Sequence, residues 1–339
     1  MSLKKNMHTI AGVGSPVVDQ VARVPFSFVD DIDGEKGGME LVDTEEFASL
    51  LAMLPEPPLS TPGGSAGNTA FALARLGIAS RFLGVVGDDS AGIYYRNTFS
   101  TIGGNISSFR TRSGQPTAQC LSLVTPDGER TMRTHLGAAL TLAVEDITEM
   151  DFRGCDHAHI EGYLLFNPEL MHHALKTAKA AGCSVSVDLA SFEVVGAAKA
   201  ELPELLINYV DMVFANEEEA EAYAGTPDHD RCLEMLSQCC SIAVIKYGAR
   251  GAVIRNGNET CTVEASPVKH VVDTTGAGDM WAAGFLYGMG RGRTLQQSGE
   301  CASLLGAAVV QHEGAALPES LWETLLERLH LLHDPAQCN

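Results

Sequence analysis

The sequence has no long apolar segment and few basic residues, and each shortage excludes a class of protein. Its longest apolar runs, such as 304–310, fall far short of the roughly 20 residues that a membrane-spanning helix needs. Residues 1–10 lack the apolar core of a signal peptide. The 23 Lys and Arg face 43 Asp and Glu, a formal net charge of −20, which disfavours binding to nucleic acid or to an anionic membrane. We therefore expect a cytoplasmic protein whose partner is neither of these.

Cysteine gives no framework either. Nine cysteines are scattered without the spacing of a zinc site, and their odd number and the adjacent pair Cys239-Cys240 argue against disulfides. Repeats and low-complexity tracts are absent. With 339 residues, the chain is long enough for one large α/β domain with an appendage. Because the net charge is negative, a phosphorylated ligand would have to be held by backbone N–H groups, a few cations and Mg²⁺.

Short apolar runs alternate with helix-like segments along most of the chain. This alternation predicts a three-layer α/β fold, a mostly parallel sheet with helices on both faces and ligands at the carboxyl ends of its strands. The expected strands are 8–15, 79–86, 155–160, 184–188, 211–214, 242–246 and 252–255. The expected helices are 66–76, 168–181, 203–209, 217–224, 231–237, 280–287 and 299–310.

Two passages, about 20–45 and about 107–138, interrupt this alternation. The first is rich in acidic residues and glycine, and the second holds β-like runs on either side of the turn 126–128. We expect them to form a small β-rich lid inserted in a single domain that spans 1–339. Association of two copies through this lid is a further expectation.

The stretch 272–285 changes abruptly from turn-forming residues to a helical apolar pattern. Gly276 and Gly278 have no Cβ, so the backbone can approach a ligand closely, and the helix that follows presents its N–H donors and positive dipole end to an anion. Asp279 lies at this anion-binding turn. A carboxylate there either takes a proton from a hydroxyl that attacks phosphorus or caps the helix. The residue types alone leave both roles open.

Four motifs in order give the chain a family resemblance. The turn DTTGAGD at 273–279 closely resembles the last signature of the ribokinase-like, or PfkB, family of carbohydrate and nucleoside kinases. The run GGSAGN at 63–68 resembles the first signature, NEEE at 216–219 fits the N-x-x-E motif, and KYGARG at 246–251 fits a K-x-G-x-x-G turn. The resemblance covers nearly the whole chain, and it implies transfer of the γ-phosphate of ATP·Mg²⁺ to a hydroxymethyl group of a sugar or nucleoside.

The resemblance also implies roles for individual residues. Asp279 would be the base, and the N–H groups around Gly276, Ala277 and Gly278 would stabilise the phosphate, with Arg130 reaching it from the lid. The substrate residues would be Asp19, Gly63, Gly64, Asn68 and Leu136. The nucleotide residues would be Asn216, Lys246, Gly248, Gly251, Thr275, Gly278, His312 and Gly314, with the 246–251 turn and the 299–315 region walling an adenine pocket.

Metal ligands follow from the same resemblance. Asn216 and Glu219 would position Mg²⁺, mainly through water, and oxygen ligands suit that ion. In some members of the family, carbonyls at the positions of Asp273 and Thr275 hold K⁺. Each motif also has a structural alternative: Asp19 as a turn residue, Asn68 bonded to its own backbone, Arg130 at the surface, and the acidic run as a helix start favoured by the dipole.

The acceptor remains open between two classes. The segments 36–39 and 136–139 resemble the adenosine-kinase-like branch, but Ser15 stands where that branch usually carries asparagine, so free sugars such as ribose or fructose stay alternatives. A sensor that binds nucleotide or sugar without turnover is a rival of another class. A dehydrogenase is disfavoured, because the Gly12-Val13-Gly14 run lacks the third glycine of a dinucleotide fingerprint. The histidines at 157, 159, 172 and 173 match no usual metal spacing and are assigned to a sheet edge and a helix surface.

Overall fold

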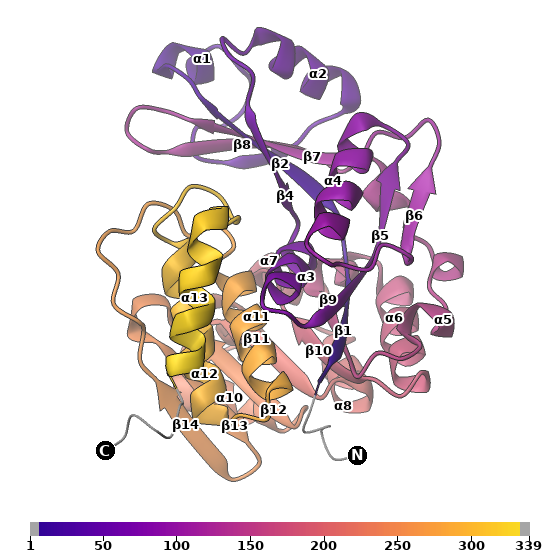
Figure 1. Cartoon of the computed structure of the whole chain (residues 1–339), viewed down its shortest axis with the longest axis vertical. Helices are drawn as coiled ribbons and strands as arrows, with labels where there is room; N and C mark the ends of the chain where they lie inside the picture. Colours follow the sequence, from indigo (N-terminus) through magenta and orange to yellow (C-terminus); the bar gives the residue numbers. More distant parts are fainter. Residues whose placement is uncertain (1–6, 333–339) are drawn as a thin grey trace.

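The computed structural model describes residues 7–332 and arranges their strands in two sheets (Figure 1). The larger sheet has the order β14-β13-β12-β11-β10-β9-β1-β5-β6. Pairing is parallel from β6 across to β12 and antiparallel at the β13 and β14 edge. Its strands are β1 (Thr9–Val13), β5 (Ala79–Gly87), β6 (Phe109–Arg112), β9 (His157–Glu161), β10 (Ser184–Asp188), β11 (Met212–Asn216), β12 (Ile242–Lys246), β13 (Ala252–Asn256) and β14 (Glu259–Val263).

Helices cover both faces of this sheet, as the alternation predicted. One buried cluster joins the sheet to α6 (Pro168–Ala180), α7 (Phe192–Ala197), α8 (Leu202–Tyr209), α9 (Glu217–Ala224) and α10 (His229–Ser237). The other joins it to α3 (Ser65–Arg75), α11 (Ala277–Gly290), α12 (Leu295–Val309) and α13 (Glu319–Leu331). The remaining elements of the main domain are α4 (Ser90–Thr101), α5 (Glu149–Phe152) and the 3₁₀ turns η1 (Gly137–Thr141), η2 (Val144–Asp146) and η3 (Gly162–Phe166).

The central helix α11 is buried along most of its length. Its small residues let it lie close to α12: a Cβ placed on Gly284 would meet the backbone of Ala302 at 2.6 Å. The close contact between α11 and both α12 and α3 fixes the N-terminal turn of α11 at the carboxyl edge of the sheet. The small-residue run that suggested this helix in the sequence thus determines where the anion-binding turn lies.

The second sheet, which we call the lid, has the order β3-β8-β7-β2-β4 and lies above the main domain in Figure 1. Its strands are β2 (Val17–Arg23), β3 (Met39–Leu41), β4 (Leu59–Gly63), β7 (Ala118–Val124) and β8 (Arg130–His135). Two helices, α1 (Phe26–Asp30) and α2 (Thr44–Met53), pack on one face through a small apolar cluster. The expected lid boundaries need correction: the lid also includes β4, whereas β6 at 109–112 pairs with β5 in the main sheet.

The assignment of His157 and His159 to an edge was wrong. Both lie on β9 in the middle of the main sheet, 0% and 1% exposed. The two rings share hydrogen bonds with the Ser186 hydroxyl at 2.7 and 2.8 Å, and His157 also contacts Ser184 at 2.8 Å. Burial lowers the pKa of His157 to about 3 and that of His159 to about 4, so both rings are neutral near pH 7.

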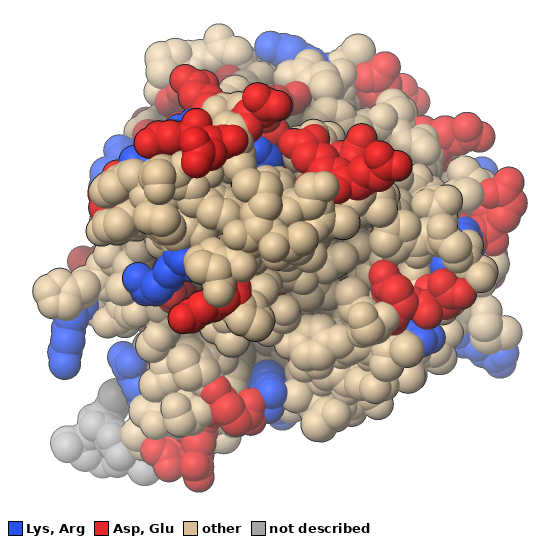
Figure 2. All heavy atoms as spheres, turned by 90° about the horizontal axis from the view of Figure 1, so that it is seen from above, with Lys and Arg blue, Asp and Glu red and all other residues tan. Residues whose placement is uncertain are grey.

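Acidic side chains dominate the surface seen from above the lid, where Asp and Glu form several groups and Lys and Arg are scattered between them (Figure 2). Within residues 7–332, none of the helices has the length and apolarity to cross a bilayer.

Candidate active site

The site lies where the lid faces the carboxyl ends of the central parallel strands and the N-terminal turn of α11. Asp279 comes from the first turn of α11, on the main domain, and Asp19 comes from the middle of β2, in the lid. Asp19 was expected at a strand end, and the strand that carries it was missed in the sequence. One carboxylate of the lid and one of the main domain therefore lie close enough to interact electrostatically.

Both oxygens of Asp279 are held by side chains of α3. Ser65 Oγ donates to Oδ1 and Asn68 Nδ2 donates to Oδ2, each at 2.8 Å, and Thr69 Oγ1 donates to the Asp279 carbonyl at 3.1 Å. The residue that precedes α11 is Gly276, so no side chain caps this helix. Asp279 is thus positioned across a helix interface, and the capping alternative does not describe it. Burial raises its pKa to about 6.

The anion-binding turn is fixed mainly by Asp273. Its Oδ1 accepts from Thr275 N at 3.1 Å and Thr275 Oγ1 at 2.8 Å, and its Oδ2 accepts from Gly314 N at 2.6 Å. Gly276 has φ 73°, a left-handed conformation that favours glycine. The Ala277 N–H donates to the Thr274 carbonyl at 3.1 Å, so this N–H, expected to face a phosphate, is engaged within the turn. K⁺ near Asp273 and Thr275 stays a prediction.

The glycine pair at 63–64 brings the lid and the main domain together. A Cβ on Gly63 would overlap the Asp19 carboxylate, and one on Gly64, whose φ is 86°, would overlap the Ser15 carbonyl. Burial, and next the charge of Asp279, raises the pKa of Asp19 to about 7 despite the opposing effect of Arg130. Asp19 is therefore a carboxylate short of hydrogen-bond donors, as expected for a group that accepts bonds from ligand hydroxyls.

Glu161 is a buried carboxylate that sequence reasoning missed. It ends β9, is 1% exposed, and accepts from Ser15 N at 2.8 Å and Ala66 N at 3.2 Å. Burial raises its pKa to about 7. It ties the chain leaving β1 to the start of α3. An acidic residue directly after a buried strand run was the available signal.

Ion pairs join the lid to the main domain. Arg130 Nη2 lies 2.8 Å from Asp273 Oδ2, with both side chains largely buried, and Arg23 pairs with Glu313 at the surface. Arg130 thus lies beside the anion-binding turn, although its contact is with a carboxylate. Leu136 is half-buried and lies between the carboxyl end of β8 and the start of η1.

The N-x-x-E residues form a capping box at the start of α9. Asn216 Oδ1 accepts from Glu219 N at 2.9 Å, while the Glu219 carboxylate accepts from Asn216 N at 2.8 Å and Asn216 Nδ2 at 2.7 Å. Burial, and next the charge of Asp188, raises the pKa of Glu219, which is 3% exposed. A buried carboxylate beside other carboxylates suits a nearby divalent cation. Because its oxygens already serve the cap, contact through water fits best.

A buried ion pair lies between these motifs. Lys246 Nζ, at the end of β12, is 2.8 Å from Asp188 Oδ2, at the end of β10. Asp188 Oδ1 also accepts from Ala190 N at 3.0 Å, and Ala190 has φ 67°, which is unusual for a residue with a side chain. Asp188 was missed in the sequence, although it too directly ends a buried strand.

A cavity of about 410 Å³ lies between the 266–272 segment, the end of α12 and α13. His312 lines it, and Lys269, His270 and Gln311 contribute polar groups; that this cavity holds adenine stays a prediction. The 246–251 turn lies elsewhere: it joins β12 to β13, and a Cβ on Gly251 would overlap the carbonyl of Val263. Gly314 contacts Asp273 through its N–H and so supports the anion-binding turn.

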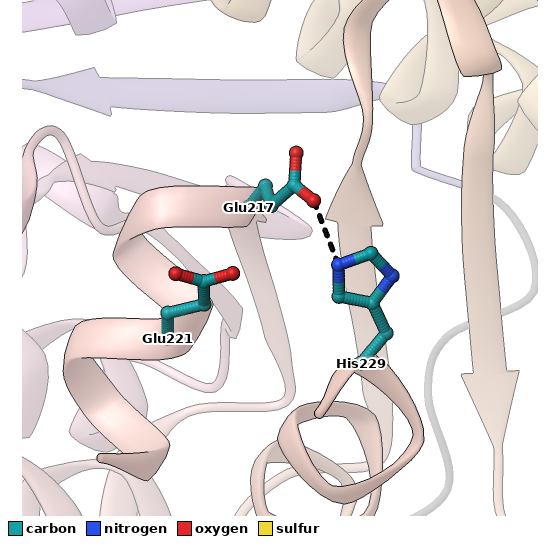
Figure 3. A group of neighbouring side chains, drawn as sticks. All are labelled: Glu217, Glu221 and His229. Atoms are coloured by element: carbon teal, nitrogen blue, oxygen red, sulfur yellow. Dashed lines mark ion pairs between the residues drawn. The ribbon is translucent and has the colours of Figure 1, made fainter. Parts of the chain in front are cut away.

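A second group of acidic and imidazole side chains lies between the N-terminal half of α9 and the start of α10. Glu217 and Glu221 lie one helical turn apart and face His229 of α10 (Figure 3), with Glu217 Oε1 2.7 Å from His229 Nε2. Glu217 also pairs with the exposed Arg250. The charge on Glu217 is thus already balanced by side chains of the protein, and the group is accounted for as a surface ion-pair network.

Comparisons with known proteins show the family of the chain and the proteins that share its fold. The pfkB family carbohydrate kinase profile matches residues 42–322. The fold superposes on an adenosine kinase from Sinorhizobium meliloti with a TM-score of 0.84 and 34% identity, covering 95% of this chain and 99% of that one. A probable sugar kinase from Rhizobium etli gives 0.83 and 32%, covering 97% and 100%. An ATP-dependent ribose-1-phosphate kinase from Halopiger xanaduensis is 31% identical over 75% of this chain and 81% of its own length. The chain belongs to the pfkB family of carbohydrate kinases and is a sugar or nucleoside kinase.

Proposed function

We propose that this kinase transfers the γ-phosphate of ATP·Mg²⁺ to the hydroxymethyl group of a nucleoside. The observation that carries the proposal is a pair of carboxylates close enough for the charge of one to raise the pKa of the other, Asp19 on the lid and Asp279 at the anion-binding turn. Asp19 would accept hydrogen bonds from ribose hydroxyls, and Asp279 would meet the hydroxyl that reacts.

The reaction follows from this placement. Asp279 takes the proton of the acceptor hydroxyl while the hydroxyl oxygen forms a bond to the γ-phosphorus. The bond between this phosphorus and the β–γ bridging oxygen breaks, and its electron pair leaves on ADP. The N–H groups of Gly278 and Asp279 belong to the first turn of α11, where donors lack intrahelical partners, and they would receive phosphate oxygens. Mg²⁺, positioned by Glu219 through water, would neutralise charge on the phosphates.

The register of the lid strands favours a nucleoside over a free sugar. Residues paired across neighbouring strands share a face, as do residues two apart on one strand. The row that holds Asp19 is polar at its centre and consists of Thr61, Asp19, Cys120, Thr134 and Leu41. The next row on the same face is mostly apolar and consists of Leu59, Val21, Ser122, Met132 and Met39.

This second row offers a surface for a flat ring. Leu59 is 69% exposed and Met39 is 56% exposed, although both lie on the face that Asp19 shares. A ribose held at Asp19 would place an attached base against this row, whereas a free sugar would leave it exposed to water. The third row carries Arg23 and Arg130, but both are paired with carboxylates of the main domain, which disfavours a phosphorylated sugar as acceptor.

A coupled assay of ADP release tests the proposal with adenosine, other nucleosides, ribose, fructose and ribose 1-phosphate as acceptors. We expect kcat/KM for at least one purine nucleoside to exceed that for each free or phosphorylated sugar by tenfold or more. A higher value for any of the sugars would reject the nucleoside proposal. No ADP release with any acceptor would favour the silent sensor.

Activity should fall in acid because Asp279 acts as a base. Its pKa is raised to about 6 by burial, so the carboxylate is protonated and inactive below that pH. Asp19, whose pKa is raised to about 7, must also be ionised to hold the acceptor. We therefore expect kcat/KM, which reports groups in the free enzyme, to begin to fall near pH 7 and to drop more than tenfold for each pH unit below about 6. Rates measured from pH 4.5 to 8 at saturating Mg²⁺ would show the break, and a pH-independent rate down to 5 would contradict the assignment.

Arg130 should matter through lid closure. Arg130→Met removes the buried pair with Asp273 and leaves that carboxylate with one partner fewer. We expect kcat/KM for the acceptor to fall about tenfold and protease cleavage of the lid hairpin at 126–128 to become faster, because a looser lid orients the acceptor less well. Arg231→Met, which removes an exposed pair with Glu234 on α10, is the matched control. If the two variants had the same kcat/KM and the same rate of cleavage, the Arg130–Asp273 pair would not stabilise the closed lid.

A further inference from the structure

Lys246, the first residue of the 246–251 turn, lies beside the first turn of α11. Its Nζ is 3.0 Å from the position that a Cβ on Gly278 would occupy. Gly278 is in the first turn of α11, next to Asp279. The ammonium group therefore adjoins the N–H donors that would receive phosphate oxygens, whereas the cavity that His312 lines is formed by other elements.

The Lys246 side chain is held in this position. It reaches from β12 past β11 to Asp188 on β10, and the ion pair is 2.8 Å long with 12% and 8% of the two side chains exposed. Asp188 is itself anchored by the Ala190 N–H. An ammonium group fixed in this way loses little freedom when a ligand arrives, so it can stabilise charge without reorganisation.

The charge around Lys246 explains why a cation is needed there. Asp188, Glu219 and Asp279 all act on it electrostatically, and His159, which interacts with Lys246, is neutral because burial lowers its pKa to about 4. Burial lowers the pKa of Lys246, but the charges of Asp188 and Glu219 outweigh this effect and the net change is upward. Lys246 is thus charged near neutral pH and balances carboxylates that would otherwise repel a triphosphate.

We propose that Lys246 is a catalytic residue whose ammonium group donates a hydrogen bond to the γ-phosphate and stabilises it during transfer, with Asp188 as the positioning residue that aims it. This inference rests on the proposed function, because the γ-phosphate is placed by the turn that carries Asp279. Lys246 neither gains nor loses a proton in the step. The proton still passes to Asp279, and the leaving electron pair stays on ADP.

The test compares Lys246→Met with Lys179→Met. Lys179 forms a 2.8 Å pair with Asp211 at the opposite end of the same sheet, with 25% of its side chain exposed. Lys179→Met therefore breaks a similar Lys–Asp pair far from the site. We expect Lys246→Met to lose about a hundredfold in kcat, as for loss of one charge-stabilising donor, with the KM for the acceptor little changed. Calorimetry should show ATP binding without Mg²⁺ weakened about tenfold. Lys179→Met should match the wild type in both.

A second variant separates chemistry from folding. Lys246→Met leaves Asp188 without its buried partner, so the double variant Lys246→Met/Asp188→Asn removes that charge as well. We expect it to regain thermal stability but not kcat. If the wild type turns over and Lys246→Met keeps more than a third of kcat with unchanged ATP binding, the inference is wrong and the proposed function stands. If the wild type releases no ADP with any acceptor, the proposed function fails, and ATP binding by the variant still decides the inference.

Discussion

Asp279→Asn is expected to bind ATP and acceptor about as well as the wild type and to lose roughly 10³-fold or more in kcat. The amide cannot accept the hydroxyl proton, and a positioned general base contributes on the order of 10² to 10⁴ in rate. The shape of the site should persist, since an amide oxygen at this position can still accept from Ser65 Oγ or Asn68 Nδ2. Steady-state kinetics with the best nucleoside, together with calorimetric Kd values, would measure the two effects separately.

The control for this variant is Asp228→Asn. Asp228 caps α10 by accepting from Arg231 N at 3.1 Å, so it tests what replacement of a carboxylate at a helix start does by itself. Asparagine is about as good a cap, and we expect its kcat to stay within twofold of the wild type. A kcat for Asp279→Asn within tenfold of the wild-type value would falsify the role of this carboxylate as base.

Asp19→Asn should weaken binding of the acceptor instead. We expect kcat/KM for the nucleoside to fall by about 10³ and ATP binding to stay unchanged. Hydrogen bonds to a charged acceptor contribute about 1.5–3 kcal/mol each, and two ribose hydroxyls would lose their carboxylate partner together. The amide also replaces one acceptor oxygen by an NH₂ donor, which would face a ribose hydroxyl. The NH₂ group has little room to turn away, because the side chain lies directly against Gly63, where an added Cβ would overlap it. Most of the loss should appear in the KM of the nucleoside.

Asp127→Asn is the matched control for Asp19. Asp127 lies at the tip of the β7–β8 hairpin of the same lid, where it pairs with Lys36 at 2.6 Å and is exposed. Exposed pairs of this kind contribute little, so kinetic constants within twofold of the wild type are expected. If both variants had the same kinetics, or if Asp19→Asn weakened ATP as strongly as nucleoside, Asp19 would not be the acceptor ligand.

The parallel sheet could be predicted because its strands carry their own signal. β12 is a short apolar run and β10 alternates serine with valine, both have buried side chains on both faces, and their bounds agree with the expected 184–188 and 242–246. The lid could not be predicted as well. β3 has three exposed residues and β4 reads LSTPG, so neither shows the alternation that would mark a strand, and each exists through pairing with distant segments.

The site divides in the same way. Asp279 could be placed from the glycine turn that precedes it, because that turn is local. The partners that fix it, Ser65 and Asn68, come from a helix more than 200 positions away, and no local pattern indicates that these side chains donate to it. The buried carboxylates Glu161 and Asp188 went unnoticed because each is the last residue of a short strand with no motif around it, and their function depends on which strands lie side by side.

The connections between the two sheets restrict how the lid can move. The chain crosses from one sheet to the other four times: β1 to β2, β4 to α3, β6 to β7 and β8 to η1. Four covalent links along one line oppose sliding and leave rotation about that line as the easy motion. The angle of this rotation therefore sets the separation between Asp19 and Asp279. It also sets the distance between the oxygen of a bound alcohol and the phosphorus that it attacks.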